Sequence, residues 1–213
     1  TVGHFKDDKV GMVQSRWGHL NEDYSLFTRL QAFALDAHFM VEQMGRNAQK
    51  AFINFNGTGG IWRKSCILDA GDWHADTLTE DLDLSYRAQQ KGWEFIYRPD
   101  VVSPAELPPV MSAIKSQQFR WTKGGAECAR KHLWHVLKGT FPLKVKIHAA
   151  AHLLNSTLFI AILLVSLSSI PVWWGFYKGL IPLEYFKLAA FFLFGFVIIA
   201  SVYFFANLNL NNF

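Results

Sequence analysis

Hydrophobic and polar positions divide this chain of 213 residues into a mixed part and an apolar part. Residues 10–14 form a short apolar run and predict a buried strand. Over residues 24–50, apolar side chains recur every three or four positions, which predicts one long amphipathic helix. Beyond residue 146, charged side chains become rare. We therefore expect a globular domain followed by apolar helices.

Glycine and proline separate shorter predicted elements in the middle of the chain. Thr79 suits the position before the first turn of a helix, and Gly92 suits the position after its last turn. Pro99 is expected to break a strand, because proline lacks the N–H that a sheet requires. The pattern also predicts a polar loop at 15–23, strands at 51–55, 93–97 and 101–102, a turn at 57–60, and helices at 64–70, 80–91 and 112–132. This alternation of strands and helices predicts an α/β fold.

Two apolar stretches, at 152–174 and 185–206, are long enough to span a bilayer as helices. The alternative is a pair of buried helices in a soluble protein. Basic residues crowd before the first stretch, whereas the connection between the two carries only Lys178, so the polar domain is predicted on the cytoplasmic side. Segment 138–151 is basic and amphipathic and is expected to lie at the membrane surface. These features predict an integral protein of a plasma, inner or Golgi membrane, with the lipid bilayer as a partner.

Composition narrows the possible partners. Hydrophobic residues make up 51% of the chain, a high share for a soluble domain, and the formal net charge is +4. Basic residues gather between positions 115 and 146, which suits contact with anionic lipid headgroups. We find no recognised nucleic-acid-binding motif, so no nucleic-acid partner is expected. Cys66 and Cys128 lack metal-ligand spacing, which predicts two reduced, packed thiols.

Asp81 is the first candidate for chemistry. It lies in the first turn of a predicted helix, where exposed backbone N–H groups favour a carboxylate. An ionised, positioned Asp accepts a proton from a sugar hydroxyl as that oxygen attacks. Glu80 and Asp83 lie close by, so charge alone does not single out Asp81. The simpler alternative is that these acids only stabilise the start of the helix.

Two further segments have residue types that suit sugar and phosphate binding. Asn56, Gly57 and Thr58 open a glycine-rich turn that lets a sugar or phosphate approach the main chain, although a purely structural turn is the alternative. Arg120 has the fork geometry to hold a diphosphate. The neighbouring Trp121 offers a flat face to a sugar ring. Gln117 precedes Arg120 by three positions and shares its helix face. Considered alone, these three residues are equally typical of a helix that packs near a membrane.

The order of the motifs resembles the membrane-embedded inverting glycosyltransferases of family two, which include cellulose synthase and its mannan-synthase and glucan-synthase relatives. The matching motifs are Thr79-Glu80-Asp81 and Gln117-Gln118-Phe119-Arg120-Trp121. The flanks also resemble the mannan-synthase and glucan-synthase-like branch, at residues 13–21 (VQSRWGHLN), 38–43 (HFMVEQ), 52–63 and 80–93. The resemblance covers nearly the whole polar part of the chain.

The resemblance implies a role for each candidate residue. Asp81, with Glu80 beside it, would be catalytic, with Asp81 as the base. Gln117, Arg120 and Trp121 would bind the donor diphosphate and the acceptor sugar. The turn of Asn56, Gly57 and Thr58 would line the acceptor end of the site.

The implied architecture is the C-terminal half of a GT-A (Rossmann-like) domain at 1–137, an interfacial segment at 138–151, and transmembrane helices at 152–174 and 185–206. The implied substrates are a nucleotide-sugar donor, UDP-glucose or GDP-mannose, and a growing glycan acceptor. The family also implies a divalent cation, Mg²⁺ or Mn²⁺, held by an upstream Asp-x-Asp motif. Asp7-Asp8 lacks that spacing, so we assign no residue of this chain to a metal and expect a fragment lacking both ends.

Two other functions fit the same motifs. One is a lipid glycosyltransferase of the ceramide-glucosyltransferase type, which adds a single sugar to a membrane lipid. The other is a non-catalytic membrane partner that keeps the fold without turnover. The segments at 13–21 and 52–63 favour the polysaccharide branch over the first, and the intact Asp81, Arg120 and Trp121 argue against the second.

Overall fold

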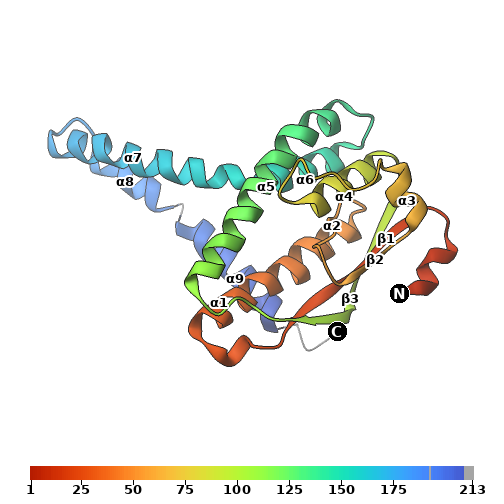
Figure 1. Cartoon of the computed structure of the whole chain (residues 1–213). Helices are drawn as coiled ribbons and strands as arrows, with labels where there is room; N and C mark the ends of the chain where they lie inside the picture. The colour runs from red at the N-terminus through yellow and green to blue at the C-terminus, as the bar shows by residue number, and fades with distance from the viewer. Residues whose placement is uncertain (192, 209–213) are drawn as a thin grey trace.

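A computed structural model describes residues 1–191 and 193–208, in which a small mixed sheet lies along one side of a group of helices (Figure 1). The central strand β1 (Val10–His19) pairs antiparallel with β2 (Gly60–Trp62) and parallel with β3 (Glu94–Ala105). The sheet order is therefore β2-β1-β3. The α/β fold class predicted from the sequence is confirmed.

Strand β1 continues to His19, although the polar pattern predicted a loop from residue 15. The parallel partner β3 explains the difference, because the two strands stay paired up to His19 and Ala105. The predicted break at Pro99 is also wrong, since β3 is one strand. The pairing shifts register between Ser15 and Arg16, so that residues 99–101 bulge out of the ladder. A bulge tolerates proline because no ladder N–H is needed there.

The predicted long helix forms, with an irregularity that the sequence pattern did not reveal. It comprises α1 (Leu26–Ala37), the π-helical segment His38–Gln43 and α2 (Met44–Ala48). Ser25 starts it with a capping box, in which its side chain accepts from the Thr28 N–H and the Thr28 hydroxyl accepts from the Ser25 N–H. The π-helical turn changes which side chains face the sheet after Ala37.

Segment 51–55 was predicted as a strand but does not join the sheet. Its backbone instead bonds to side chains of α4 (Glu80–Gln90). The Ile53 N–H donates to Gln89 Oε1 at 3.0 Å, and Gln89 Nε2 donates to the Ile53 carbonyl at 2.7 Å. The Phe55 N–H donates to Ser85 Oγ at 2.9 Å. These side chains satisfy backbone groups that a neighbouring strand would otherwise satisfy.

Helices α3 (Lys64–Asp69) and α4 pack on one another, and α5 (Met111–Lys138) crosses α4 on its other side. The largest buried cluster joins α4, α5 and α6 (Leu143–Leu153) around Tyr86. Helix α6 contributes Val145, Ala149 and Leu153 to this cluster. The part of segment 138–151 that forms α6 thus packs one face into the domain.

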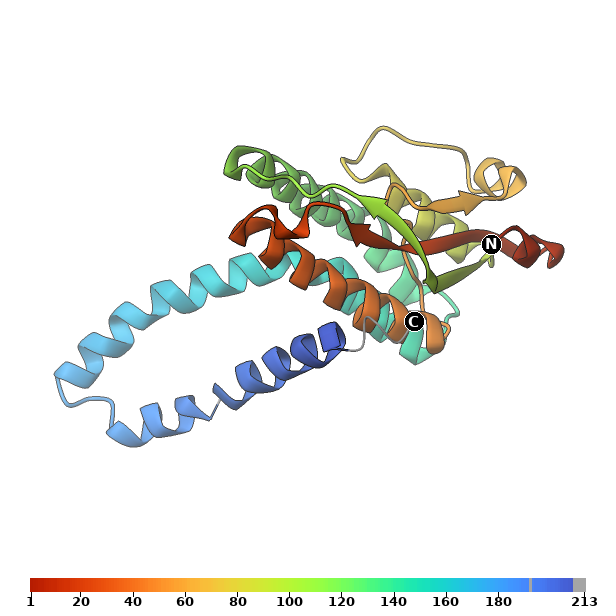
Figure 2. The same cartoon turned by 90° about the horizontal axis from the view of Figure 1, so that it is seen from below.

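Two helical stretches are long and apolar enough to cross a membrane. The first runs from Leu143 to Tyr177 through α6, a short 3-10 turn and α7 (Leu158–Tyr177). The second runs from Leu183 to Leu208 through α8 (Leu183–Ala190) and α9 (Leu193–Leu208). They project from the domain as a hairpin, and α9 returns beside α1 (Figure 2). There the Tyr203 and Phe33 rings lie 6.0 Å apart.

Candidate active site

A cavity of about 200 Å³ lies where α1, the turn after residue 55, α4 and α5 meet. Its walls are formed by Trp17, Leu35, His38, Asn54, Asn56, Thr79, Asp81, Leu82, Trp121 and His152. The carboxylate of Asp81 and the indole of Trp121, which the motifs paired from positions far apart in the sequence, therefore share one cavity. Asn56 of the predicted turn lines it as well.

Asp81 occupies the first turn of α4 and is half-buried. Burial raises the pKa of its carboxyl to about 6, with the negative charge of Glu80 adding to the rise and the Leu82 N–H, at 2.7 Å from Oδ1, opposing it. A carboxyl with this pKa is mostly ionised at neutral pH and is still a better proton acceptor than an ordinary aspartate. Its environment therefore suits a general base.

The main chain at Gly57 lies against the Asp81 carboxylate. Gly57 has a φ of +77°, and a Cβ at this position would lie 3.3 Å from Asp81 Oδ2. Glycine adopts this left-handed conformation without strain, whereas other residues do so rarely. The turn therefore brings backbone, with no side chain, beside the candidate base.

Strand β1 holds the turn in place. The Gln14 side chain accepts from the Asn56 N–H at 3.1 Å and donates to the Thr58 carbonyl at 3.0 Å. Trp17 Nε1 donates to the same carbonyl at 3.4 Å. The three predicted turn residues thus differ in position: Asn56 lines the cavity, Gly57 packs on Asp81, and Thr58 anchors the turn to β1.

The remaining predicted residues lie outside the cavity. Arg120 and Glu80 are exposed and Gln117 is half-buried, and none of the three is among the lining residues. Within the described part of the chain, Gln117 and Arg120 make no side-chain hydrogen bond or ion pair. They share α5 with Trp121, which lines the cavity.

A close approach of α5 to the start of α4 holds Trp121 near Asp81. A Cβ at Gly124 would lie 2.5 Å from Thr79 Oγ1, so only glycine fits there. The Leu78 N–H donates to Glu127 Oε2 at 2.8 Å, next to this contact. Sequence reasoning missed Gly124, and the available signal was a glycine inside a predicted helix.

Thr79 precedes α4 as predicted, but its side chain makes no capping hydrogen bond. Its hydroxyl instead lies 3.5 Å from Cys128 Sγ on α5. The predicted N-cap hydrogen bond of Thr79 is therefore wrong, because its hydroxyl contacts Cys128 on α5 instead. Cys128 is buried and its thiol is free, as predicted, and burial raises its pKa to about 11.

Asp83 joins α4 to α5 through a buried charge cluster. Its carboxylate lies 2.7 Å from His132 Nε2, 2.8 Å from Lys131 Nζ and 2.8 Å from Arg87 Nε. Burial alone would raise the pKa of Asp83, but these donors together hold it well below its ordinary value. Asp83 therefore has a structural environment unlike that of Asp81, although the two lie two positions apart.

The ligand atoms of His74, Asp76 and Asp83 lie within 4.8 Å of one another, as in a metal site. Lys131 Nζ, however, lies 2.8 Å from Asp83 and 2.9 Å from Asp76. The ammonium group takes the position that a cation bridging these two carboxylates would take. The group does not fit a divalent ion and is an ion-pair cluster.

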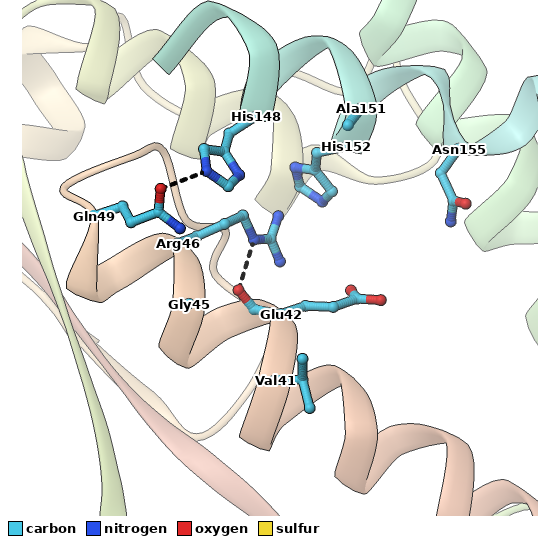
Figure 3. Close-up of a pocket in the computed structure, with 9 residues that line it drawn as sticks. All are labelled: Val41, Glu42, Gly45, Arg46, Gln49, His148, Ala151, His152 and Asn155. Carbon is cyan, nitrogen blue, oxygen red and sulfur yellow. Dashed lines mark hydrogen bonds between the residues drawn. The ribbon is translucent and has the colours of Figure 1, made fainter. Parts of the chain in front are cut away.

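A second cavity of about 450 Å³ lies between the helix of residues 38–48 and α6 (Figure 3). Arg46 and Glu42 line it from one side, and His148 and His152 from the other. Arg46 is only 5% exposed, and its Nη1 has no hydrogen-bond acceptor among the residues that the structure describes. His152 lines both cavities, so the two are adjacent.

Comparisons with known proteins agree with these motifs. A sequence model of the family described as "Glycosyl transferase family group 2" matches residues 1–206. The chain is 43% identical over 152 residues to "Probable glucomannan 4-beta-mannosyltransferase 4" of Oryza sativa subsp. japonica, which covers 71% of the chain and 27% of that relative. It is 39% identical over 173 residues to "Glucomannan 4-beta-mannosyltransferase 1" of the same organism, and the match covers 81% of the chain and 32% of that relative.

A third relative is "Glucomannan 4-beta-mannosyltransferase 2" of Arabidopsis thaliana, which is 39% identical over 151 residues, covering 71% of the chain and 28% of the relative. The chain therefore spans less than a third of the length of each of these curated relatives.

Proposed function

Because the chain belongs to glycosyl transferase family group 2, as its motifs predicted, we propose that it forms the acceptor side of a membrane-bound inverting β-glycosyltransferase. The reaction transfers a hexose from a nucleotide-sugar to a growing polysaccharide. The observation that carries this proposal is the single cavity lined by Asp81, Trp121 and Asn56. The names of the relatives favour mannose over glucose as the transferred sugar, and the donor is then GDP-mannose or another mannose nucleotide rather than UDP-glucose.

Asp81 is the proposed base. The acceptor hydroxyl transfers its proton to the Asp81 carboxylate while its oxygen bonds to the anomeric carbon of the donor. The bond from that carbon to the diphosphate oxygen breaks, and the nucleoside diphosphate leaves with the electron pair. Attack opposite the leaving group inverts the anomeric centre. Trp121 supplies a flat apolar surface on which the acceptor ring stacks.

Arg120 and Gln117 are proposed to bind the leaving diphosphate from the face of α5 next to Trp121. A guanidinium placed there stabilises charge that develops on the leaving oxygen. Glu80 acts through its charge, which raises the pKa of Asp81. A bound Mg²⁺ or Mn²⁺ would neutralise the diphosphate further. No residue of this chain is assigned to that ion.

The proposed placement has residues 1–137 on the cytoplasmic side, segment 138–151 at the interface, and spans at 152–174 and 185–206. Support comes from the two long apolar helices and from the basic residues of α5 and α6 that precede α7. Helix α6 then has one face in the domain core and Lys144 and Lys146 available for lipid headgroups.

The test uses the full-length enzyme in lipid nanodiscs, supplied separately with GDP-mannose and UDP-glucose. Asp81→Asn removes the proton acceptor and keeps the side-chain size, so we expect transfer to fall at least about a hundredfold. Asp23→Asn is the matched control, because that carboxylate is exposed and does not line the cavity. Unchanged transfer by Asp81→Asn would remove Asp81 from this role. A product of one sugar on a lipid, in place of a polymer, would replace the polysaccharide assignment.

A further inference from the structure

The helical segment His38–Gln43 reaches the Asp81 cavity with a side chain that the proposed reaction does not use. His38 begins this π-helical turn, lines the cavity, and has a side chain 23% exposed. π-helical turns inside α-helices occur frequently at functional sites. The HFMVEQ sequence of this segment matched the family motifs but received no role from them.

A chain of hydrogen bonds fixes the orientation of the amide groups behind the cavity. Arg46, which bears only donors, donates through Nη2 to Gln43 Oε1 at 3.2 Å. The amide nitrogen of Gln43 must then point the other way, where it donates to Asn56 Oδ1 at 2.8 Å and to the Asn54 carbonyl at 2.9 Å. Arg46 therefore determines, through Gln43, which of the two terminal atoms of the Asn56 side chain is the oxygen.

The hydrogen-bond partners of His38 determine, in the same way, which ring nitrogen carries its proton. Asn56 Nδ2 lies 3.2 Å from His38 Nε2, which must accept because the amide nitrogen only donates. His38 Nδ1 lies 2.8 Å from Glu42 Oε2 and donates to that carboxylate. Burial works against ionisation of Glu42, but the hydrogen bond from His38 and the nearby charge of Arg46 favour it, and the pKa of Glu42 lies below its ordinary value. Each hydrogen bond in the series from Arg46 through Gln43, Asn56 and His38 to Glu42 thus has one possible donor and one possible acceptor.

This network leaves one N–H of the Asn56 side chain without an acceptor among the described residues. The Asn56 Nδ2 group has two hydrogens, and among the described residues only His38 accepts one of them. Asn56 lines the cavity, and the next residue, Gly57, packs on the Asp81 carboxylate. The second N–H of Asn56 is therefore available beside the candidate base, and the bond that Asn56 Oδ1 accepts from Gln43 polarises the amide further.

We propose that His38 is a positioning residue for the acceptor sugar. Held by Glu42, it keeps the Asn56 amide turned so that its second N–H donates to a hydroxyl oxygen of the acceptor bound over Asp81. The inference rests on the proposed function and adds to it a recognition group for the acceptor. Without His38, Asn56 loses one of the two side-chain bonds that fix its amide, and the acceptor loses a directed donor.

The test measures KM for the acceptor and for the donor separately, in the full-length enzyme with a soluble β-linked oligosaccharide as acceptor. His38→Ala removes the bond to Asn56, so the acceptor KM should rise about five- to tenfold while the donor KM stays unchanged. His38→Gln places an amide oxygen near the former Nε2 and should restore acceptor KM to within about twofold. Glu42→Gln should give an intermediate rise.

His135→Ala on the exposed side of α5 is the matched control, since among the described residues the His135 side chain bonds only to the Lys131 carbonyl of its own helix. Thermal unfolding of each purified variant separates a folding defect from a positioning defect. An unchanged acceptor KM in His38→Ala, a rise in the donor KM instead, or a His38→Gln variant as defective as the alanine variant would each overturn the inference.

The Asp81→Asn variant separates the two proposals. If it keeps transfer while His38→Ala raises the acceptor KM, the base assignment fails and the positioning role stands. If it loses transfer while His38→Ala behaves as wild type, the base assignment stands and the positioning role fails.

Discussion

Gly124→Ala tests whether the contact between α4 and α5 sets the geometry of the cavity. A Cβ at residue 124 would lie 2.5 Å from both Oγ1 and Cγ2 of Thr79 and 2.8 Å from its backbone nitrogen. Rotating the Thr79 side chain removes the first two clashes but leaves the third. The backbone of α5 or of the segment before α4 must therefore move.

The required movement is about 1 Å, the difference between these separations and ordinary contact. Overpacking of this kind costs about 1–3 kcal/mol of stability. Trp121 lies one helical turn before Gly124, so the shift moves its indole relative to Asp81. A displacement of about 1 Å between a positioning group and the reacting atoms lowers rates by up to about a hundredfold. We expect the transfer rate to fall by more than the loss of folding stability alone would cause.

The measurements are the transfer rate and the thermal unfolding temperature of the full-length enzyme carrying Gly124→Ala. Gly45→Ala in α2 is the matched control, because a Cβ there meets no atom of the described residues within 4 Å and the helix gains intrinsic propensity. A Gly124→Ala enzyme with wild-type rate and unfolding temperature would refute the reasoning, since the helices would then have space that the structure denies them.

Other outcomes follow from the carboxylates of Asp81 and Asp83 in α4. A base must be ionised to take a proton, so with the pKa of Asp81 at about 6 transfer should fall about tenfold per pH unit below pH 6 in a pH–rate profile. A profile flat to pH 4.5 would instead indicate a carboxyl near the ordinary 3.8, and Glu80→Gln should move the inflection to lower pH. Asp83→Asn leaves Lys131 and His132 without their buried carboxylate and should destabilise the fold by about 3–5 kcal/mol. Asp76→Asn, at the exposed end of the same cluster, should lower the unfolding temperature much less, and equal effects would contradict the structural role of Asp83.

The sequence predicted the elements whose pattern is local. The strand at 10–14, the long helix at 24–50 and the two apolar stretches all depend on periodicity or composition that a short window reveals. The pairing of Asp81 with Trp121 came from the order of family motifs, and the shared cavity agrees with it. Arg120 and Gln117, predicted with equal weight, lie outside that cavity.

The differences arise where distant residues decide the local structure. Strand β1 extends to His19 because β3 supplies a parallel partner about 85 residues later. Segment 51–55 bonds to Gln89 and Ser85 and so never needs a neighbouring strand. The role of Gly124 depends on Thr79, and that of His38 on Asn56, which no periodic pattern reveals.

The most direct test of the central claim is a structure of the full-length enzyme with an acceptor oligosaccharide bound. We expect the terminal acceptor hydroxyl within about 2.6–3.2 Å of an Asp81 carboxylate oxygen, and the acceptor ring stacked on the Trp121 indole. An acceptor bound with its terminal hydroxyl away from Asp81, or with Trp121 outside the sugar site, would contradict this claim.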